Sequence, residues 1–311
     1  MPVIPTTISF PSRALICLGI VSVFWGTTWI ASRQGVFFMP PLQLAGIRQL
    51  LAGAIYVIYF TYKKMPWPKG REWYIIGVLC LLNILCTNGL TTWGVKYISA
   101  GLGAIIAATF PLWMVIIGLF TSKERIPVAA LKGFLLGFAG VCIIFYEHLA
   151  DFLNPAFLFG ISISVTASWT WALGTIFTKK EARDFNPYFS LGFQMLLGGI
   201  TLLAGSYASG IAIPLTEIPW QAWTAIAYLV VFGSVFAFAA YLYALQRLSV
   251  EQMSVYAYIN PVVAVVLGAL IFGERLTTFI IAGGAVTLYG VYLINQALRK
   301  VNSGGEPAET A

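Results

Sequence analysis

Residues 107–125 read AATFPLWMVIIGLFTSKER, and residues 257–275 read AYINPVVAVVLGALIFGER. The two stretches align without a gap at a constant offset of 150 residues (261 − 111 = 150), which places Pro111 on Pro261 and Gly118 on Gly268. The alignment extends outward to 73–141 against 223–291, with further identical pairs at Trp73/Trp223, Ser99/Ser249, Ala107/Ala257, Glu124/Glu274, Arg125/Arg275, Gly133/Gly283 and Gly140/Gly290. Because self-similarity at a fixed offset indicates a repeated structural unit, the chain is predicted to contain two copies of one unit.

Long apolar stretches dominate both copies. Of the 311 residues 59% are hydrophobic and 9% are charged, whereas a soluble domain carries roughly 25% charged residues. Stretches of about twenty apolar residues can cross a bilayer as helices, and ten are predicted, at 14–32, 42–62, 73–94, 99–121, 128–146, 155–177, 187–207, 221–245, 250–272 and 277–297. The predicted fold is an all-α integral membrane protein with five-helix repeats at 14–146 and 155–297 and a disordered cytoplasmic tail at 299–311.

The orientation of the spans follows from their number and from the positive charges. Five spans per copy mean that the second copy enters the membrane from the opposite side, so the repeats are predicted to be inverted. Cytoplasmic loops carry an excess of lysine and arginine. The termini and even-numbered loops carry Arg13, Lys63, Lys64, Lys69, Arg71, Lys123, Arg125, Lys179, Lys180, Arg183, Arg247, Arg299 and Lys300, and the odd-numbered loops carry Arg33, Lys96 and Arg275. Both termini are therefore predicted to be cytoplasmic, in agreement with an even number of spans.

Several function classes find no support in the residue pattern. The net charge of +7 comes from cations in short loops, so it indicates topology rather than nucleic-acid binding. The cysteines match no metal-ligand spacing, and His148 is expected to be a solvated loop residue, so no metal is expected. No Walker motif, nucleophile–base pair or HExxH motif occurs, so we expect neither an enzyme nor a cofactor. No Asp or Glu lies at midspan, which favours a uniporter or exchanger unless an acid at a span end, such as Glu251, couples transport.

The paired prolines lie near the centres of spans 99–121 and 250–272. Proline lacks an N–H and clashes with the carbonyl four residues earlier, so it kinks a helix and frees that carbonyl, here Ala107 and Ala257. Within lipid such a break is tolerated where protein or a wet cavity satisfies the carbonyl. Pro111 and Pro261 are therefore predicted to line a central site and act as hinges, the alternative being static packing kinks.

Hydrogen-bonding and aromatic side chains are predicted to surround this central site. A buried amide must find partners in hydrocarbon, and a deep tryptophan needs a partner for its indole N–H. The candidate substrate-binding residues are Trp25, Asn83, Trp113, Trp169, Tyr241, Tyr256, Tyr258 and Asn260. For each of them the alternative is core packing or hydrogen bonding between helices.

Arg48 is the one charged side chain well inside a predicted span. An ionisable residue within the membrane is a functional hypothesis by default. Arg48 lies six residues into span 42–62 (48 − 42 = 6), which is roughly 10 Å of helix rise, so its long side chain could also reach the interface. Two interpretations therefore stay open: a contact to substrate or gate, and a structural anchor.

Several short motifs resemble the drug/metabolite transporter superfamily, in particular its ten-helix members of the EamA-domain type. The matching residues are FWG at 24–26 with Arg33, GIR at 46–48 with Ala52, Pro111 with GLF at 118–120 and KER at 123–125, and Pro261 with Gly268 and FGERL at 272–276. The resemblance implies an inner-membrane carrier for amino acids or related metabolites, often an exporter, that works by alternating access. It also implies a central cavity bounded by helices one, three, four, six, eight and nine, which includes Trp25, Asn83, Trp113, Trp169, Tyr241 and Tyr256.

Within this resemblance more than one function stays open. Aromatic richness is compatible with aromatic or hydrophobic amino acids as substrates. A sugar-phosphate or nucleotide-sugar exchanger of the same superfamily would need cations in the cavity, and only Arg48, Lys96 and Lys132 lie near spans. A channel would lack a saturable pocket. The expected partners are a small-molecule substrate and the lipid bilayer, with the protein acting as a monomer or weak homodimer.

Overall fold

The computed structural model describes residues 12–121, 128–148, 150–181, 185–248 and 256–303. No strand occurs in these residues, as predicted, because each segment in lipid must pair its own backbone polar groups. The first half contains α1 (Ser12–Phe38), α2 (Pro41–Tyr62), α3 (Arg71–Leu79), η1 (Cys80–Gly89), α4 (Leu90–Gly94), α5 (Ala100–Ala108), α6 (Phe110–Thr121) and α7 (Val128–Glu147). After a short turn η2 (Asp151–Leu153), the second half contains α8 (Pro155–Glu181), α9 (Pro187–Ala208), η3 (Leu215–Glu217), α10 (Trp220–Tyr228), η4 (Leu229–Phe236), α11 (Ala237–Leu245), α13 (Tyr256–Phe272) and α14 (Thr278–Ser303).

Seven helices in the described residues are long and apolar enough to cross a membrane: Arg13–Phe38, Pro41–Tyr62, Arg71–Gly94, Val128–Glu147, Pro155–Thr178, Pro187–Ala208 and Trp220–Leu245. Three shorter apolar helices, Ala100–Met114, Tyr256–Phe272 and Thr278–Ile294, coincide with the remaining predicted spans. The protein is thus a multi-pass membrane protein. The structure supports seven full-length spans, and the predicted number of ten stays a prediction.

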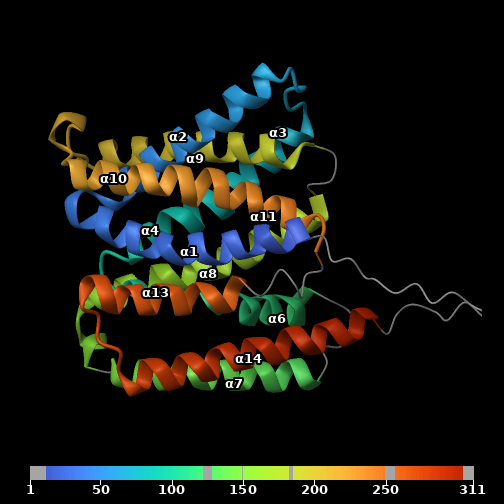
Figure 1. Cartoon of the computed structure of the whole chain (residues 1–311), viewed down its shortest axis with the longest axis vertical. Coiled ribbons are helices and arrows are strands. Elements are labelled where there is room, and N and C mark those ends of the chain that lie inside the picture. The colour runs from blue at the N-terminus through green and yellow to red at the C-terminus, as the bar shows by residue number, and fades with distance from the viewer. Residues whose placement is uncertain (1–11, 122–127, 149, 182–184, 249–255, 304–311) are drawn as a thin grey trace, which may run out of the picture.

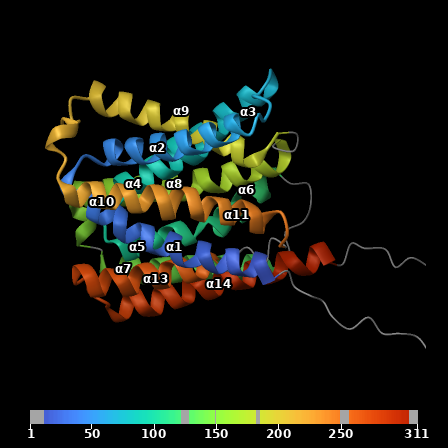
Figure 2. The same ribbon diagram turned by 45° about the horizontal axis from the view of Figure 1, so that its top comes forward.

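The helices form two outer pairs with a central group between them. The α2–α9 pair and the α7–α14 pair lie at opposite ends of the longest axis, and α1, α8 and α13 lie between the pairs (Figure 1). In the turned view the first turn of α1 and the last turn of α14 lie at the same side of the molecule (Figure 2). Helix α14 ends at Ser303, so the helix continues into the tail predicted to be disordered.

Glycines let α2 and α9 approach to backbone contact. A Cβ added to Gly53 would lie 2.3 Å from the amide nitrogen of Leu196, and one added to Gly199 would lie 2.3 Å from the amide nitrogen of Leu50. The early part of the repeat aligns at an offset of 146 residues, with WGTTWIASR at 25–33 on WALGTIFTK at 171–179. The two contacts are reciprocal, because Gly53 and Leu50 correspond at this offset to Gly199 and Leu196 (199 − 53 = 146; 196 − 50 = 146). Reciprocal contacts are those of a self-complementary interface between two similar units.

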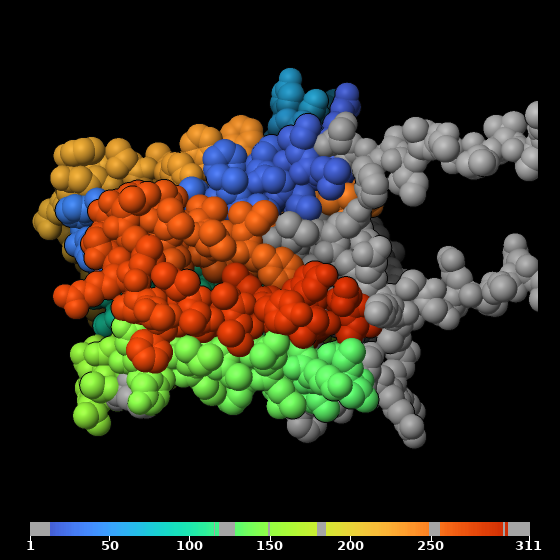
Figure 3. Space-filling model, turned by 60° about the horizontal axis from the view of Figure 1, so that its bottom comes forward, coloured from blue at the N-terminus to red at the C-terminus, as the bar shows by residue number. Residues whose placement is uncertain are grey.

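The α7–α14 pair has the same kind of interface. Space-filling Figure 3 shows α14 lying along α7. A Cβ on Gly133 would lie 2.8 Å from the carbonyl oxygen of Gly290, and a Cβ on Gly283 would lie 2.7 Å from that of Gly140. Gly133 and Gly140 correspond to Gly283 and Gly290 at the offset of 150 (283 − 133 = 150; 290 − 140 = 150), so these contacts are reciprocal as well.

Each half also contains a π-helical stretch at a matching place. Segments η1 and η4 interrupt the long helices 71–94 and 220–245, for which the sequence predicts the uninterrupted spans 73–94 and 221–245. The wider turn appears in the side-chain bonds of η1, where Asn88 Nδ2 donates to the carbonyl of Asn83, five residues back, at 2.7 Å. Because π-helical turns are often found at functional sites, these two segments are candidates for functional positions.

Glu274 links the two halves at the start of α5. Its carboxylate accepts hydrogen bonds from the backbone N–H groups of Ala100 at 2.8 Å and Gly101 at 3.3 Å. An acidic cap at a helix N-terminus is worth about 1 kcal/mol.

Glu274→Ala is therefore expected to lower the free energy of unfolding by about 1 kcal/mol, measured by thermal unfolding in detergent. The exposed neighbour Arg275 supplies the control, since Arg275→Ala should change little; equal melting temperatures for all three proteins would contradict the capping role.

Candidate functional site

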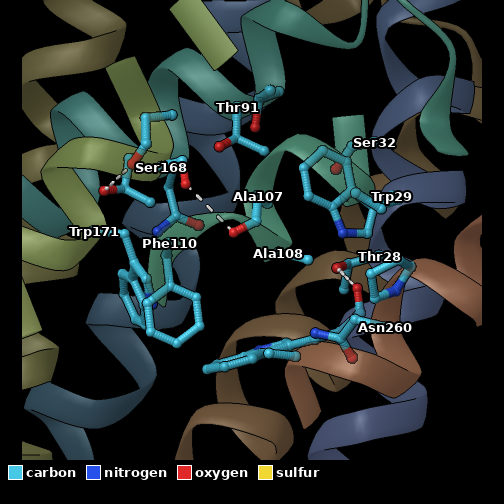
Figure 4. Close-up of a pocket in the computed structure, with 18 of the residues that line it drawn as sticks. Thr28, Trp29, Ser32, Thr91, Ala107, Ala108, Phe110, Ser168, Trp171 and Asn260 are labelled. Atoms are coloured by element: carbon cyan, nitrogen blue, oxygen red, sulfur yellow. Dashed lines mark hydrogen bonds between the residues drawn. The ribbon is translucent and has the colours of Figure 1, made fainter. Parts of the chain in front are cut away.

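A cavity of about 150 Å³ lies between helices of the two halves. The first half lines it with Trp25, Thr28, Trp29 and Ser32 of α1, Arg48 of α2, Thr87 and Asn88 of η1, Thr91 and Thr92 of α4, Ala104, Ala107 and Ala108 of α5, and Phe110 of α6. The second half contributes Ala167, Ser168 and Trp171 of α8, Phe238 of α11, and Tyr256, Ala257, Asn260 and Pro261 of α13. Figure 4 shows these side chains converging from several helices on one space. Its described lining contains one cation, many hydroxyls and aromatic rings, and no carboxylate.

An aromatic cluster (Trp25, Trp171, Phe238, Tyr241 and Tyr256) borders one side of the cavity. Trp25 is its centre, with ring centroids 5.0 Å from Phe238, 5.0 Å from Tyr241, 5.3 Å from Tyr256 and 6.2 Å from Trp171. The Trp25 indole Nε1 also donates to the carbonyl of Gly233 in η4 at 3.2 Å. Trp25 therefore connects α1 of the first half to four helical segments of the second, α8, η4, α11 and α13.

The opposite side of the cavity carries small polar residues where the repeat places aromatic ones. At the offset of 150, Asn88 corresponds to Phe238 and Thr91 corresponds to Tyr241 (238 − 88 = 150; 241 − 91 = 150). Tyr256 is the first residue of α13, on the even-loop side, and Tyr241 lies in α11, the last segment of helix 220–245. Thr91 lies in α4, the last segment of helix 71–94, which ends on the odd-loop side. Small polar side chains therefore gather toward the odd-loop end of the cavity, beside Trp29, and the aromatic cluster lies toward its even-loop end.

The two prolines behave differently. Helix α5 ends at Ala108 and α6 begins at Phe110, so the helix is interrupted at Thr109, two residues before the buried Pro111, which lies outside the cavity lining. Helix α13 continues through Pro261, which does line the cavity. The predicted free carbonyl of Ala107 is present, and it accepts a hydrogen bond from Ser168 Oγ of α8 at 3.4 Å (Figure 4). The break near Pro111 is therefore stabilised by the other half.

Ser168→Ala would remove the donor that the second half supplies to this carbonyl and leave it only the backbone N–H of Thr109. The net contribution of one hydrogen bond is about 0.5–1.5 kcal/mol, and a bond as long as 3.4 Å places the expected loss of unfolding free energy near 1 kcal/mol or below. Thermal unfolding measures the loss. Ser162→Ala is the matched control on α8, because Ser162 is exposed and bonds only within its own helix, to Leu158. An identical response of the two variants would contradict this role of Ser168.

Arg48 is buried at the cavity wall. Its side chain is 6% exposed, and its Nε donates to Ser234 Oγ of η4 at 2.9 Å. Gly233 lies against it, since a Cβ there would lie 3.2 Å from an Arg48 terminal nitrogen. The side chain does not reach the interface, so the anchor that extends outward is not the observed arrangement.

Most of this chain matches a known family. The model of the EamA-like transporter family matches residues 12–146 and 158–296. The chain belongs to this family. The resemblance inferred from the short motifs is thereby confirmed.

Relatives of this EamA-like chain are found in bacteria and plants. The uncharacterized inner membrane transporter YedA of Escherichia coli is 29% identical, over 88% of this chain and 87% of its own. The uncharacterized transporter YvbV of Bacillus subtilis is 26% identical, over 91% of this chain and 92% of its own. A chloroplastic WAT1-related protein of Arabidopsis thaliana is 28% identical, over 88% of this chain and 67% of its own. A crystal structure that is 18% identical covers 94% of this chain with a TM-score of 0.66, which shows the shared fold.

The structure places only some of the sequence-derived candidates at the cavity of this EamA-like protein. Trp25, Tyr256 and Asn260 line it. Tyr241 lies directly behind them, with its ring 5.9 Å from that of Tyr256. The Asn260 amide also faces the carbonyls of Ser22 and Tyr256, to which its nitrogen can donate, so it ties α13 to α1.

Four other candidates lie outside the cavity lining. Trp169 is 42% exposed; it lies two residues before Trp171 and points to another face of α8. Asn83 packs against Gly174 of α8. Tyr258 packs beside the α7–α14 pair, and the Trp113 indole nitrogen is buried without a partner in the described structure. Glu251, named as an acid that could couple transport, lies outside the described residues.

Sequence reasoning missed the hydroxyl side of the cavity. Ser32, Thr91 and Ser168 line it, yet none of them was a candidate. Serine and threonine can bond carbonyls of their own helix, as Thr28 does with the carbonyl of Trp25 at 2.7 Å, so they carry little cost in an apolar span. Trp171, the repeat counterpart of Trp25 (171 − 25 = 146) and one of the aromatic residues that the sequence singles out, also lines the cavity.

Proposed function

We propose that this EamA-like protein is a secondary carrier that moves amino acids, including aromatic or hydrophobic ones, across the inner membrane by alternating access. The observation that carries the proposal is the cavity, which both halves line with rings, hydroxyls and one cation. A space of about 150 Å³ accepts a group of benzene size. Rings also suit an amino acid because they attract both an apolar side chain and an ammonium group.

The proposed cycle uses the repeat. Ten spans arranged as two inverted repeats, 14–146 and 155–297, with both termini cytoplasmic, would let the halves rock about the break near Pro111 and the kink at Pro261. The reciprocal contacts of α2 with α9 and of α7 with α14 support this arrangement. Export or facilitation is the proposed direction, and the lack of a carboxylate in the described lining supports a facilitator or exchanger.

Counterflow in proteoliposomes tests the proposal. Vesicles preloaded with single unlabelled amino acids should take up the same labelled amino acid in a saturable manner, and protein-free vesicles should not. Uptake that never saturates would indicate a channel. Exchange only of phosphorylated or nucleotide-linked metabolites would contradict the amino-acid proposal and favour the sugar-phosphate or nucleotide-sugar class.

A further inference from the structure

The environment of the Arg48 guanidinium shows what kind of group it can bind. Arg48 makes no ion pair within the described structure, and its one hydrogen bond is to the neutral hydroxyl of Ser234. Its terminal nitrogens, Nη1 and Nη2, have no hydrogen-bond partner in the described structure, and neither is fully shielded from open space. Arg48 lines the cavity, so the cavity is the open space within reach of these nitrogens.

A buried cation without an anion is costly in a membrane protein. Ionisable residues within spans pair with one another, contact backbone carbonyls or face a wet pathway. No carboxylate borders the cavity in the described residues, so the protein itself supplies no counter-charge there. An anion that enters the cavity would bind Arg48 more strongly than it would bind an arginine in water, because the guanidinium is partly desolvated.

Because Nε is already hydrogen-bonded, only one edge of the Arg48 guanidinium is available to such an anion. Arginine binds a carboxylate through two parallel N–H groups, using either Nε with one terminal nitrogen or both terminal nitrogens. Nε already donates to Ser234 Oγ at 2.9 Å, so the edge formed by Nη1 and Nη2 is the one available to a carboxylate. That edge matches the two oxygens of one carboxylate and carries one positive charge.

We infer that Arg48 binds the α-carboxylate of the transported amino acid through Nη1 and Nη2, while Ser234 holds Nε from the other half. This inference rests on the proposed function and names the residue that selects for the acid. The aromatic cluster lies on the even-loop side of the same cavity, within which the remainder of the amino acid would extend. Arg48 is then a residue that determines specificity rather than a passive anchor.

Matched ligand pairs test the inference. L-Phenylalanine with L-phenylalaninamide, and L-leucine with L-leucinamide, differ only at the carboxyl group, and each competes with the labelled acid in counterflow. Wild-type protein should prefer the acid by roughly 10- to 100-fold. Arg48→Gln should reduce this ratio to about one, and Arg48→Lys should retain a smaller preference because it keeps a point charge without the fork.

The matched control is Gln194, the repeat counterpart of Arg48 (194 − 48 = 146). Gln194 is buried on α9, bonds to Ser190 on its own helix at 3.1 Å and does not line the cavity. Gln194→Leu should therefore keep the wild-type ratio of acid to amide. Thermal unfolding of each variant checks that it is folded.

Each outcome decides one statement. An acid preference in Arg48→Gln equal to that of wild type would overturn the inference and leave the proposed function standing. If wild type exchanges neither acid, the proposed function fails and the inference fails with it. Should Arg48→Gln not fold, the wild-type ratio and Arg48→Lys decide: equal use of acid and amide by wild type, or an unchanged ratio in Arg48→Lys, would overturn the inference.

Discussion

Gly53→Ala is expected to destabilise the protein by about 3 kcal/mol, the upper end of the usual cost of overpacking. The added Cβ would lie 2.3 Å from the Leu196 amide nitrogen and 2.8 Å from the Gly192 carbonyl oxygen. Both are backbone atoms, so no side chain can rotate away, and α2 and α9 must separate along their crossing. The melting temperature in detergent, followed by tryptophan fluorescence, measures the loss.

The repeat supplies both a replicate and a control for this experiment. Gly199→Ala should give a similar loss, because its Cβ would lie 2.3 Å from the Leu50 amide nitrogen in the reciprocal contact. Gly205→Ala, on the same helix α9, has nothing within 4 Å of the added Cβ. It should be neutral or stabilising, by up to about 1 kcal/mol, because alanine favours helix over glycine. If Gly53→Ala were as stable as Gly205→Ala, the close approach of α2 and α9 would be contradicted.

Trp25→Ala is expected to lower counterflow at least about tenfold and to destabilise the fold by about 3–5 kcal/mol. The variant removes the centre of the aromatic cluster, whose ring contacts contribute roughly 0.5–1.5 kcal/mol each. It also removes the indole N–H that donates to the Gly233 carbonyl at 3.2 Å. Trp25→Phe, which keeps a ring but loses this donor, should fall between Trp25→Ala and wild type.

Trp169→Ala is the control for that prediction. Both tryptophans lie at midspan, but Trp169 is 42% exposed and outside the cavity lining. Its replacement should leave counterflow within about twofold of wild type, because no ring or hydrogen bond of the site is lost. Similar losses from the two variants would mean that the cavity has no special dependence on Trp25.

Sequence patterns were sufficient for the fold class and the family. Apolar stretches of span length require helices in lipid, and the motifs around Pro111 and Pro261 pointed to the family whose model matches 12–146 and 158–296. The position of a residue along its helix can be read from the sequence as well, because distance along a helix is proportional to residue number. Trp25, Tyr256 and Asn260, taken at midspan depth, do line the cavity.

The direction in which each side chain points around its helix was not predictable. Trp169 and Trp171 differ by two residues and hence by about 200° of rotation, and only Trp171 lines the cavity. Asn83 and Trp113 lie at suitable depth but pack elsewhere. In a span that is apolar on all sides, the periodicity of apolar residues does not distinguish the helix face toward lipid from the face toward the protein core, because both surroundings are apolar.

By itself, then, the sequence determined that the chain forms apolar helices, that its second half repeats its first and that it belongs to a transporter family. These are properties of composition and order, which act locally along each helix. The π-helical turns within helices 71–94 and 220–245 were not predicted either, although they are local features of those helices. Only the tertiary structure decided that Arg48 turns inward to Ser234 and that rings and hydroxyls of both halves line one cavity. Those two features depend on how the halves pack, because each brings together residues that are distant in the chain, as are Arg48 and Ser234 at 186 positions apart.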